Sequence, residues 1–414
     1  MSLLCLPPLL GLLLFAPLMA AQEDAAAHLR RAQSYQQAGN RAEARTEYEA
    51  ALRLDPGLVE ARIRLGLLLL DLKQANRARE LLEGPAQGAS AETLLAIGVA
   101  YLRAGLLEDA QRHLEHASHL APDLSRVDSL LGQVYSARHL YPAAIERLRR
   151  AVRKEPTDPQ GHYLLGVTLS LAGDKDGGLG ELEKASRLDL HSAVFAYYLG
   201  LAYLDRGRTA DGAGALEQAV RIDPGDANAR LNLGWALVSL GRNREAKEHL
   251  GAVLKLRPRD AVACFLLGES ERLLGDTEAA IIRFTQALEW DGRMADALFS
   301  RGTVYYLRQE RDKARADYER LVAAHPRHAG GHYQLGKLLL ALGELEPAAA
   351  HLKVSVEMEP GNKAAHYQLA RLYRQLGKPD EARREEALFR SLGVEAQDDA
   401  GWRRDRPQRR PPDP

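Results

Sequence analysis

The sequence predicts an all-α fold in which similar helical hairpins stack side by side as a solenoid. Two observations support this prediction. A pattern of small and apolar residues returns every 34 residues after about residue 24, except that the second copy is two residues shorter, and each copy has room for two short helices. A hairpin of this size cannot bury its apolar stripe alone, so it needs neighbours.

The clearest copy begins at Ala227, and its first half is typical of a helix. Asp226 can cap the start of this helix, and Gly241 can end it. One face carries three leucines at helical spacing, which are Leu233, Leu237 and Leu240.

The second half of the same copy predicts another helix that runs back along the first. Ala246, Leu250 and Val253 repeat the helical spacing, and Asn243 is placed to cap the start. Pro258 is expected to stop this helix, because proline lacks the amide hydrogen and clashes with the preceding turn. The copy is therefore expected to form a helical hairpin.

Two positions of every copy carry only small residues, which predicts a close contact between the two helices. The eighth positions are Ala32, Gly66, Gly98, Gly132, Gly166, Gly200, Gly234, Gly268, Gly302, Gly336 and Ala370. The twentieth positions are Ala44, Ala78, Ala110, Ala144, Gly178, Gly212, Ala246, Ala280, Ala314, Ala348 and Ala382. The eleven copies are expected at residues 25–58, 59–90, 91–124, 125–158, 159–192, 193–226, 227–260, 261–294, 295–328, 329–362 and 363–392.

The spacing and residue types resemble the tetratricopeptide repeat family over about nine tenths of the chain. The eleventh position carries Tyr35, Tyr101, Tyr135, Tyr203, Tyr305 and Tyr373. The thirty-second position carries Pro56, Pro122, Pro156, Pro224, Pro258, Pro326 and Pro360. Ser90, Leu190 and Gly292 replace that proline in three copies, and Pro85 stands where the family usually has alanine. The resemblance implies a right-handed superhelical solenoid of antiparallel helix pairs whose concave groove binds protein partners.

The two ends of the chain differ from the repeats. Residues 1–21 hold an apolar stretch followed by small residues, which predicts a secretory signal peptide cleaved near Ala20 or Ala21. The alternative is an uncleaved membrane tether. The last hairpin carries Glu386 where other copies have Leu, Phe or Tyr, so it is expected to cap the stack. Residues 393–414 are rich in Pro, Arg and Asp and are predicted to be disordered.

Composition argues against nucleic acid and bulk membrane surfaces as partners. Acidic and basic residues number 56 each, so no net charge favours polyanions. The basic run from Glu146 to Glu155 is interpreted as a solvated helix face. Removal of the signal peptide would leave Cys264 alone, and this cysteine is interpreted as a small core residue.

No catalytic, metal or cofactor site is predicted, so the chain is interpreted as a non-enzyme. His162, His332 and His366 share the fourth position of their copies, but the 34-residue period keeps them too far apart to share an ion. They are interpreted as packing residues. His116 and His119 can share a helix face, but no cysteine or carboxylate cluster completes a site there.

The resemblance places a peptide-binding groove along the first helices, mainly at positions two, five, nine and twelve of each copy, with position six added by the family's carboxylate clamp. The residues carried over to it are Tyr163, Tyr197, Asn228, Leu231, Asn232, Trp235, Phe265, Glu269, Arg272, Phe299, Tyr306, Tyr333, Lys337, Tyr367, Arg371 and Arg374. Aromatic rings bury large areas at small entropic cost, and isolated charges set orientation. The open alternative is that these aromatic residues only support neighbouring helices. Leu231 and Phe265 stand where a clamp for a terminal carboxylate would need lysine, so an internal peptide or a folded partner is expected.

The predicted function is an exported, non-catalytic scaffold that binds protein partners, periplasmic or secreted, in assembly of an envelope, pilus or secretion complex. One alternative is a substrate-recruiting accessory subunit of an enzyme complex. Another is a chaperone-like holder of unfolded exported chains. Self-association through the leucine-rich early copies is a further possibility.

Overall fold

The computed structural model describes residues 24–86 and 88–392. The predicted signal peptide at residues 1–21 and the predicted disordered tail at residues 393–414 lie outside this range. The described residues form 22 helices and no strand, which confirms the all-α prediction and the repeat count.

The helices are α1 (Ala25–Gln37), α2 (Arg41–Leu54), α3 (Val59–Asp71), α4 (Ala75–Ala86), α5 (Ala91–Arg103), α6 (Leu107–Leu120), α7 (Ser125–Ala137), α8 (Tyr141–Lys154), α9 (Pro159–Leu171), α10 (Lys175–Leu188), α11 (Ala193–Asp205), α12 (Thr209–Ile222), α13 (Ala227–Ser239), α14 (Asn243–Leu256), α15 (Ala261–Leu273), α16 (Thr277–Trp290), α17 (Ala295–Leu307), α18 (Arg311–Ala324), α19 (Ala329–Leu342), α20 (Leu345–Met358), α21 (Lys363–Gln375) and α22 (Pro379–Ser391).

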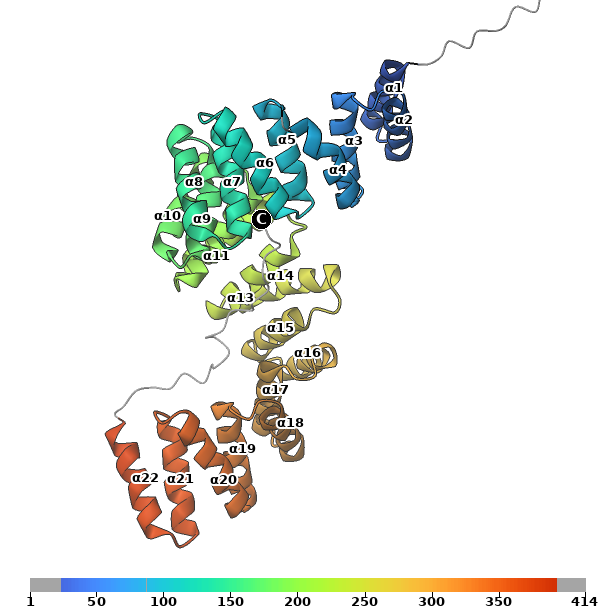
Figure 1. The fold of residues 1–414 in the computed structure, drawn as a ribbon. Coiled ribbons are helices and arrows are strands. Elements are labelled where there is room, and N and C mark those ends of the chain that lie inside the picture. The colour runs from blue at the N-terminus through green and yellow to red at the C-terminus, as the bar shows by residue number, and fades with distance from the viewer. Residues whose placement is uncertain (1–23, 87, 393–414) are drawn as a thin grey trace, which may run out of the picture. The chain divides into compact units, whose positions relative to one another are not determined.

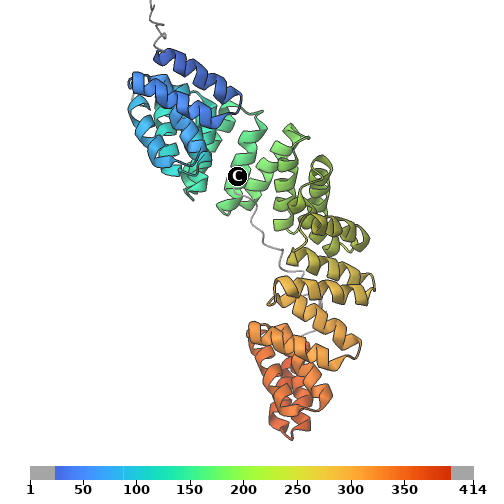
Figure 2. The same ribbon diagram turned by 90° about the vertical axis from the view of Figure 1, so that its right-hand side faces the viewer.

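The helices fall into two compact units, which divide after Pro156. The first unit holds α1–α8 and the second holds α9–α22. In each unit an odd-numbered helix packs against the following even-numbered helix, and each hairpin packs against the next one along the chain (Figures 1 and 2). None of the described helices is long and apolar enough to cross a bilayer.

The α13/α14 hairpin shows how the sequence sets the helix ends. The Asp226 carboxylate accepts hydrogen bonds from the amides of Asn228 at 2.7 Å and Ala229 at 3.2 Å, which confirms the predicted cap. Gly241 has φ +75°, a left-handed conformation that glycine adopts without strain. This glycine lets the chain turn back directly into α14.

The predicted cap of α14 by Asn243 was wrong. The cap residue is Arg242, whose amide donates to the Leu237 carbonyl at 2.8 Å across the tight turn. This bond makes Asn243 the first helical residue, so its side chain is not placed to cap the helix. The Asn243 Oδ1 atom is buried with no hydrogen-bond partner among the described residues.

The small eighth position lets the two helices of a hairpin approach each other. A Cβ atom built on Gly234 would lie 2.6 Å from Cγ of Leu250, and one on Gly98 would lie 2.6 Å from Cγ of Leu114. Leu250 and the small residue Ala246 are both fully buried. The space beside the eighth position is therefore filled by a large side chain four residues after the small twentieth position.

Cys264 is buried in α15, as predicted, and burial raises the pKa of its thiol. Ala382 is the one buried residue of α22, so most of that last described helix faces away from the core.

Candidate functional site

All of the predicted binding residues lie on the first helices of the second unit. Consecutive odd-numbered helices from α9 to α21 contact one another directly. Side chains at one repeat position are therefore neighbours, although they lie 34 residues apart in sequence.

Seven of the predicted binding residues are buried, and they are Tyr163, Tyr197, Leu231, Asn232, Trp235, Phe265 and Glu269. The ring centroids of Tyr163 and Tyr198 are 5.2 Å apart, and those of Tyr197 and Tyr198 are 5.4 Å apart. Phe265 packs on Phe284 with centroids 6.0 Å apart. The Tyr163–Tyr198 and Phe265–Phe284 pairs join different helices and stabilise their packing, so this part of the aromatic series supports the fold.

The predicted polar residues of α13 and α15 already have partners within the chain. The Asn228 Oδ1 atom accepts a hydrogen bond from Arg257 at 2.9 Å, and Asn232 donates to the Asn228 carbonyl at 2.9 Å. The fully buried Glu269 carboxylate accepts from Arg272 at 2.8 Å. These groups are held in place by internal bonds, and their role in binding stays a prediction.

The other predicted residues are accessible, and most lie on the last three first helices. We call the following seven the first-helix surface: Phe299 and Tyr306 on α17, Tyr333 and Lys337 on α19, and Tyr367, Arg371 and Arg374 on α21. Tyr367 is 47% exposed although it shares its repeat position with the 7% exposed Tyr197. The accessible part of the predicted site is thus concentrated in residues 299–374.

The first-helix surface combines aromatic rings with positive charge. The Lys337 Nζ atom lies 5.0 Å from the centroid of the Tyr306 ring, a cation–π contact. Lys337 and Arg371 occupy the same repeat position on neighbouring helices, and neither forms an ion pair within the described part of the chain. Arg374 is paired with Glu386 of α22. Lys337 and Arg371 therefore lie on helices that also carry partly or fully accessible aromatic rings.

Sequence reasoning missed a polar pair that recurs between the two helices of a hairpin. Its members are the fourth and twenty-third residues of a copy, and we call it the 4/23 pair. It joins His28 to Glu47, Asp128 to Arg147, His162 to Glu181, Arg230 to His249, His332 to His351 and His366 to Glu385. A comparison of the copies for polar residues 19 positions apart would have found this pair in the sequence.

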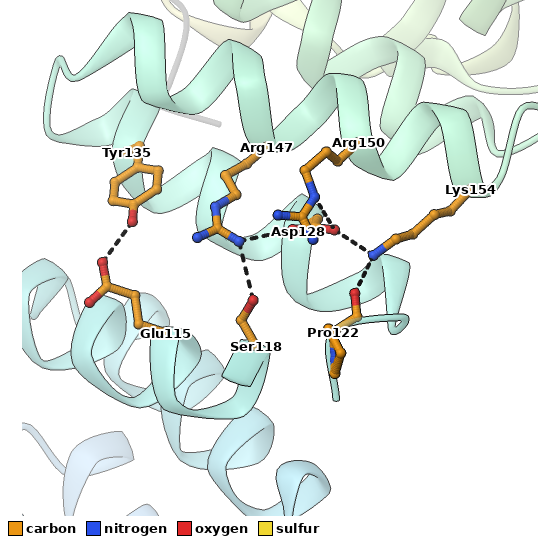
Figure 3. A network of polar contacts seen from close by, with 8 residues as sticks. All are labelled: Glu115, Ser118, Pro122, Asp128, Tyr135, Arg147, Arg150 and Lys154. Carbon is orange, nitrogen blue, oxygen red and sulfur yellow. Dashed lines mark hydrogen bonds and ion pairs between the residues drawn. The ribbon is translucent and has the colours of Figure 1, made fainter. Parts of the chain in front are cut away.

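The 4/23 pair of α7/α8 extends into a larger network in the first unit (Figure 3). The Asp128 side chain is only 2% exposed. Its carboxylate forms ion pairs with Arg147 at 3.2 Å, Arg150 at 3.5 Å and Lys154 at 2.7 Å. Arg147 also donates to Ser118 of α6 at 3.1 Å. Three cations of the basic run are therefore tied to one carboxylate, and only part of that run is the solvated face that the sequence predicted.

No group of three or more His, Cys, Asp or Glu side chains in residues 24–86 and 88–392 is arranged to hold a metal ion. The predicted metal-free, cofactor-free character of the chain stays a prediction.

Comparison with known proteins identifies the repeat. Models of the tetratricopeptide repeat match residues 25–58, 129–189, 172–227, 203–266, 265–329, 299–363 and 339–403. Superkiller complex protein 3 of Mus musculus is 32% identical over 103 residues, which are 24% of this chain and 7% of that protein. The chain therefore matches only a small part of this curated relative.

Solved structures with similar folds share little sequence with the chain. Yeast Tom70 is 14% identical, with 89% of this chain and 92% of that chain covered and a TM-score of 0.43. The Cut9–Hcn1 tetramer is 17% identical, with 84% and 76% covered and a TM-score of 0.46. YrrB, described as a tetratricopeptide repeat protein with an unusual peptide-binding site, is 19% identical, with 45% and 96% covered and a TM-score of 0.43.

Proteins built from this repeat are in general non-catalytic and typically bind protein or peptide partners. The family models match well over half of the chain, and the 22 helices account for eleven copies of the repeat. The chain belongs to the tetratricopeptide repeat family.

Proposed function

We propose that the chain is an exported, non-catalytic scaffold that holds a protein partner on the first-helix surface during assembly of an envelope, pilus or secretion complex. The observation that carries the proposal is the accessible set of aromatic and cationic side chains on α17, α19 and α21. Family membership supports the general role in protein binding.

The chemistry of this surface favours an extended segment with acidic side chains. Lys337 and Arg371 stand on neighbouring helices, and neither has a carboxylate partner in residues 24–86 and 88–392, so a ligand carboxylate can pair with either of them. The Tyr306, Tyr333 and Tyr367 rings offer apolar area beside these charges. Charge-assisted hydrogen bonds fix the register of such a ligand, and the rings contribute most of the buried area.

A charge-reversal experiment tests the binding surface. The double variant Lys337→Glu/Arg371→Glu changes two first-helix cations. The matched control Lys353→Glu/Arg384→Glu makes the same change in net charge at exposed positions on α20 and α22. Each chain is used to recover cross-linked partners from the extracytoplasmic fraction of the source cells, and circular dichroism verifies folding.

The expected result is one partner that is recovered by the parent and by the control and is lost from the first-helix variant. Equal recovery by all three chains would move the binding site elsewhere. If the extracytoplasmic fraction yields no partner and the cytoplasm yields one, the proposed export of the chain would be overturned. Deletion of residues 1–21 is expected to retain the chain in the cytoplasm, which tests the address independently of binding.

A further inference from the structure

One 4/23 pair differs from all the others because neither of its members carries a permanent charge. In α1/α2, α9/α10 and α21/α22 a histidine faces a glutamate, with Nδ1 to Oε2 distances of 2.7, 2.6 and 2.6 Å. In α19/α20 the same two positions hold His332 and His351. Two neutral imidazoles therefore meet in α19/α20, whereas every other 4/23 pair includes a Glu, Asp or Arg side chain.

The two imidazoles bring their Nδ1 atoms together, with their ring planes tilted by 34°. The Nδ1 atoms of His332 and His351 are 3.0 Å apart, and the ring centroids are 5.2 Å apart. The other nitrogen of His332, Nε2, lies 3.1 Å from the Pro326 carbonyl oxygen and must donate its hydrogen there. The Nδ1 atom of His332 is then the acceptor, and His351 supplies the single hydrogen between the rings.

This arrangement tolerates one added proton but not two. A first proton can be held on Nε2 of His351, which leaves the bond between the rings intact. A second proton would place hydrogens on both facing nitrogens and two positive charges about 3 Å apart, where unlike charges normally pair. His332 is only 7% exposed, so water cannot fully screen that repulsion.

A third histidine at the start of α19 also needs to be neutral. His328 is the cap residue of α19, and its Nδ1 atom accepts a hydrogen bond from the Gly331 amide at 2.8 Å. A protonated imidazole has no acceptor to offer, so a single proton removes this cap. Aspartate performs the same task at the starts of α9, α13 and α15.

The charged groups around these three histidines do not reverse their preference for the neutral form. Glu319 of α18 faces His351, but its carboxylate is 2.7 Å from Arg315. Near His328, Glu359 raises the pKa of this histidine and His325 lowers it. Burial is the largest cause in each case and lowers the pKa of His328, His332 and His351 below the ordinary histidine value.

The direction of the pH effect follows from this lowering. Unfolded histidines bind protons with a pKa of about 6.5, whereas the folded ones bind them only at lower pH. Between the folded and the unfolded pKa values, the unfolded hairpin therefore binds more protons than the folded one. Stability is complete above about pH 6.5 and is lost as the pH falls toward the folded pKa values.

We infer that α19/α20 is a proton-sensitive hairpin, held closed by neutral imidazoles at His328, His332 and His351 and loosened when acid protonates them. The same helix α19 carries Tyr333 and Lys337. Proton uptake therefore weakens partner binding at the first-helix surface, a consequence that rests on the proposed function.

Amide hydrogen exchange on the full chain without a partner tests the hairpin itself. Exchange is compared at about pH 7.5 and about pH 5.5, on either side of the histidine range, after correction for the intrinsic rate. The population of open α19/α20 is expected to rise roughly tenfold or more relative to α21/α22, since each linked proton contributes up to tenfold per pH unit. The α21/α22 hairpin is the internal control because its His366 faces Glu385.

Two substitutions introduce the residue types that other hairpins of the chain have at these positions. His351→Glu recreates the His–Glu pair, and His328→Asp recreates the usual cap, so the double variant is expected to lose the acid response. If the double variant does not fold, His328→Asp alone is expected to reduce the response. Equal acid responses of α19/α20 and α21/α22, or an unchanged response in the folded variants, would overturn the inference. Because no partner is present, either result is independent of the proposed binding function.

Discussion

Arg301 of α17 and Asp317 of α18 form a bidentate ion pair inside their hairpin. The Arg301 Nε atom donates to Asp317 Oδ2 at 2.8 Å, and Nη2 donates to Oδ1 at 2.7 Å. The Arg301 and Asp317 side chains are only 11% and 4% exposed. Each charge is therefore stabilised by the other and little by water. Asp317 is the twenty-third residue of its copy, but its partner is the seventh, because Leu298 occupies the fourth position.

Asp317→Leu should therefore weaken the α17/α18 hairpin strongly. It leaves the Arg301 guanidinium buried without a counter-charge, which typically costs about 3–5 kcal/mol. Amide exchange of α17 and α18 measures the local loss, which suits a long array better than a two-state unfolding curve. Adding Arg301→Met removes the stranded charge and should recover most of the loss. A double variant no more stable than the single one would contradict this account.

Gly234→Ala should destabilise the α13/α14 hairpin by about 1–3 kcal/mol, the usual cost of overpacking a core. The added Cβ would lie 2.6 Å from Cγ of Leu250, which is fully buried. Gly251→Ala is the matched control, since nothing lies within 4 Å of a Cβ built there. That change should stabilise α14 by about 0.5–1 kcal/mol because alanine favours the helix. Local exchange protection of α13 and α14 should move in opposite directions in the two variants.

The sequence predicts the repeat well because the repeat follows from local rules. The small residue at Gly234 and the cap at Asp226 act within one hairpin and recur in many copies, so they can be read from spacing alone. Exposure at the binding positions cannot be read this way. Tyr197 is 7% exposed, whereas Tyr367 at the same repeat position is 47% exposed. The difference depends on which side chains the adjacent hairpins bring.

The histidines at the fourth position illustrate the other limit. Their shared position indicated packing, but their partners lie 19 residues later on the opposite helix, and the partner type varies between copies. His162 meets Glu181, whereas His332 meets His351. Only the three-dimensional pairing shows that one of these hairpins pairs two histidines.

Asp128→Asn should loosen the contacts among α6, α7 and α8. The carboxylate holds Arg147, Arg150 and Lys154, and its removal leaves three like charges close together. Because Asp128 is buried, the expected loss of local stability is about 3 kcal/mol or more. Added salt should recover part of it by screening the repulsion.

Glu60→Gln provides the control for Asp128→Asn in the same unit. Glu60 pairs with Arg64 at 2.8 Å, but both side chains are about half exposed, at 51% and 44%. Exposed pairs of this kind contribute about 0–1 kcal/mol. Similar losses in the two variants, measured by amide exchange of α3 and α7, would show that burial of Asp128 does not set its importance.

Cys264 should react with thiol reagents only when its part of the chain opens. The side chain is 2% exposed in α15, and burial raises the pKa of the thiol, so both access and thiolate formation are disfavoured. In a Cys5→Ser variant, labelling with a disulfide reagent at about pH 8, near the ordinary cysteine pKa, should be slow and should accelerate steeply with urea. The rate should follow amide exchange of α15, because both processes require the same opening. Complete labelling within the mixing time, without denaturant, would contradict a packing role for Cys264.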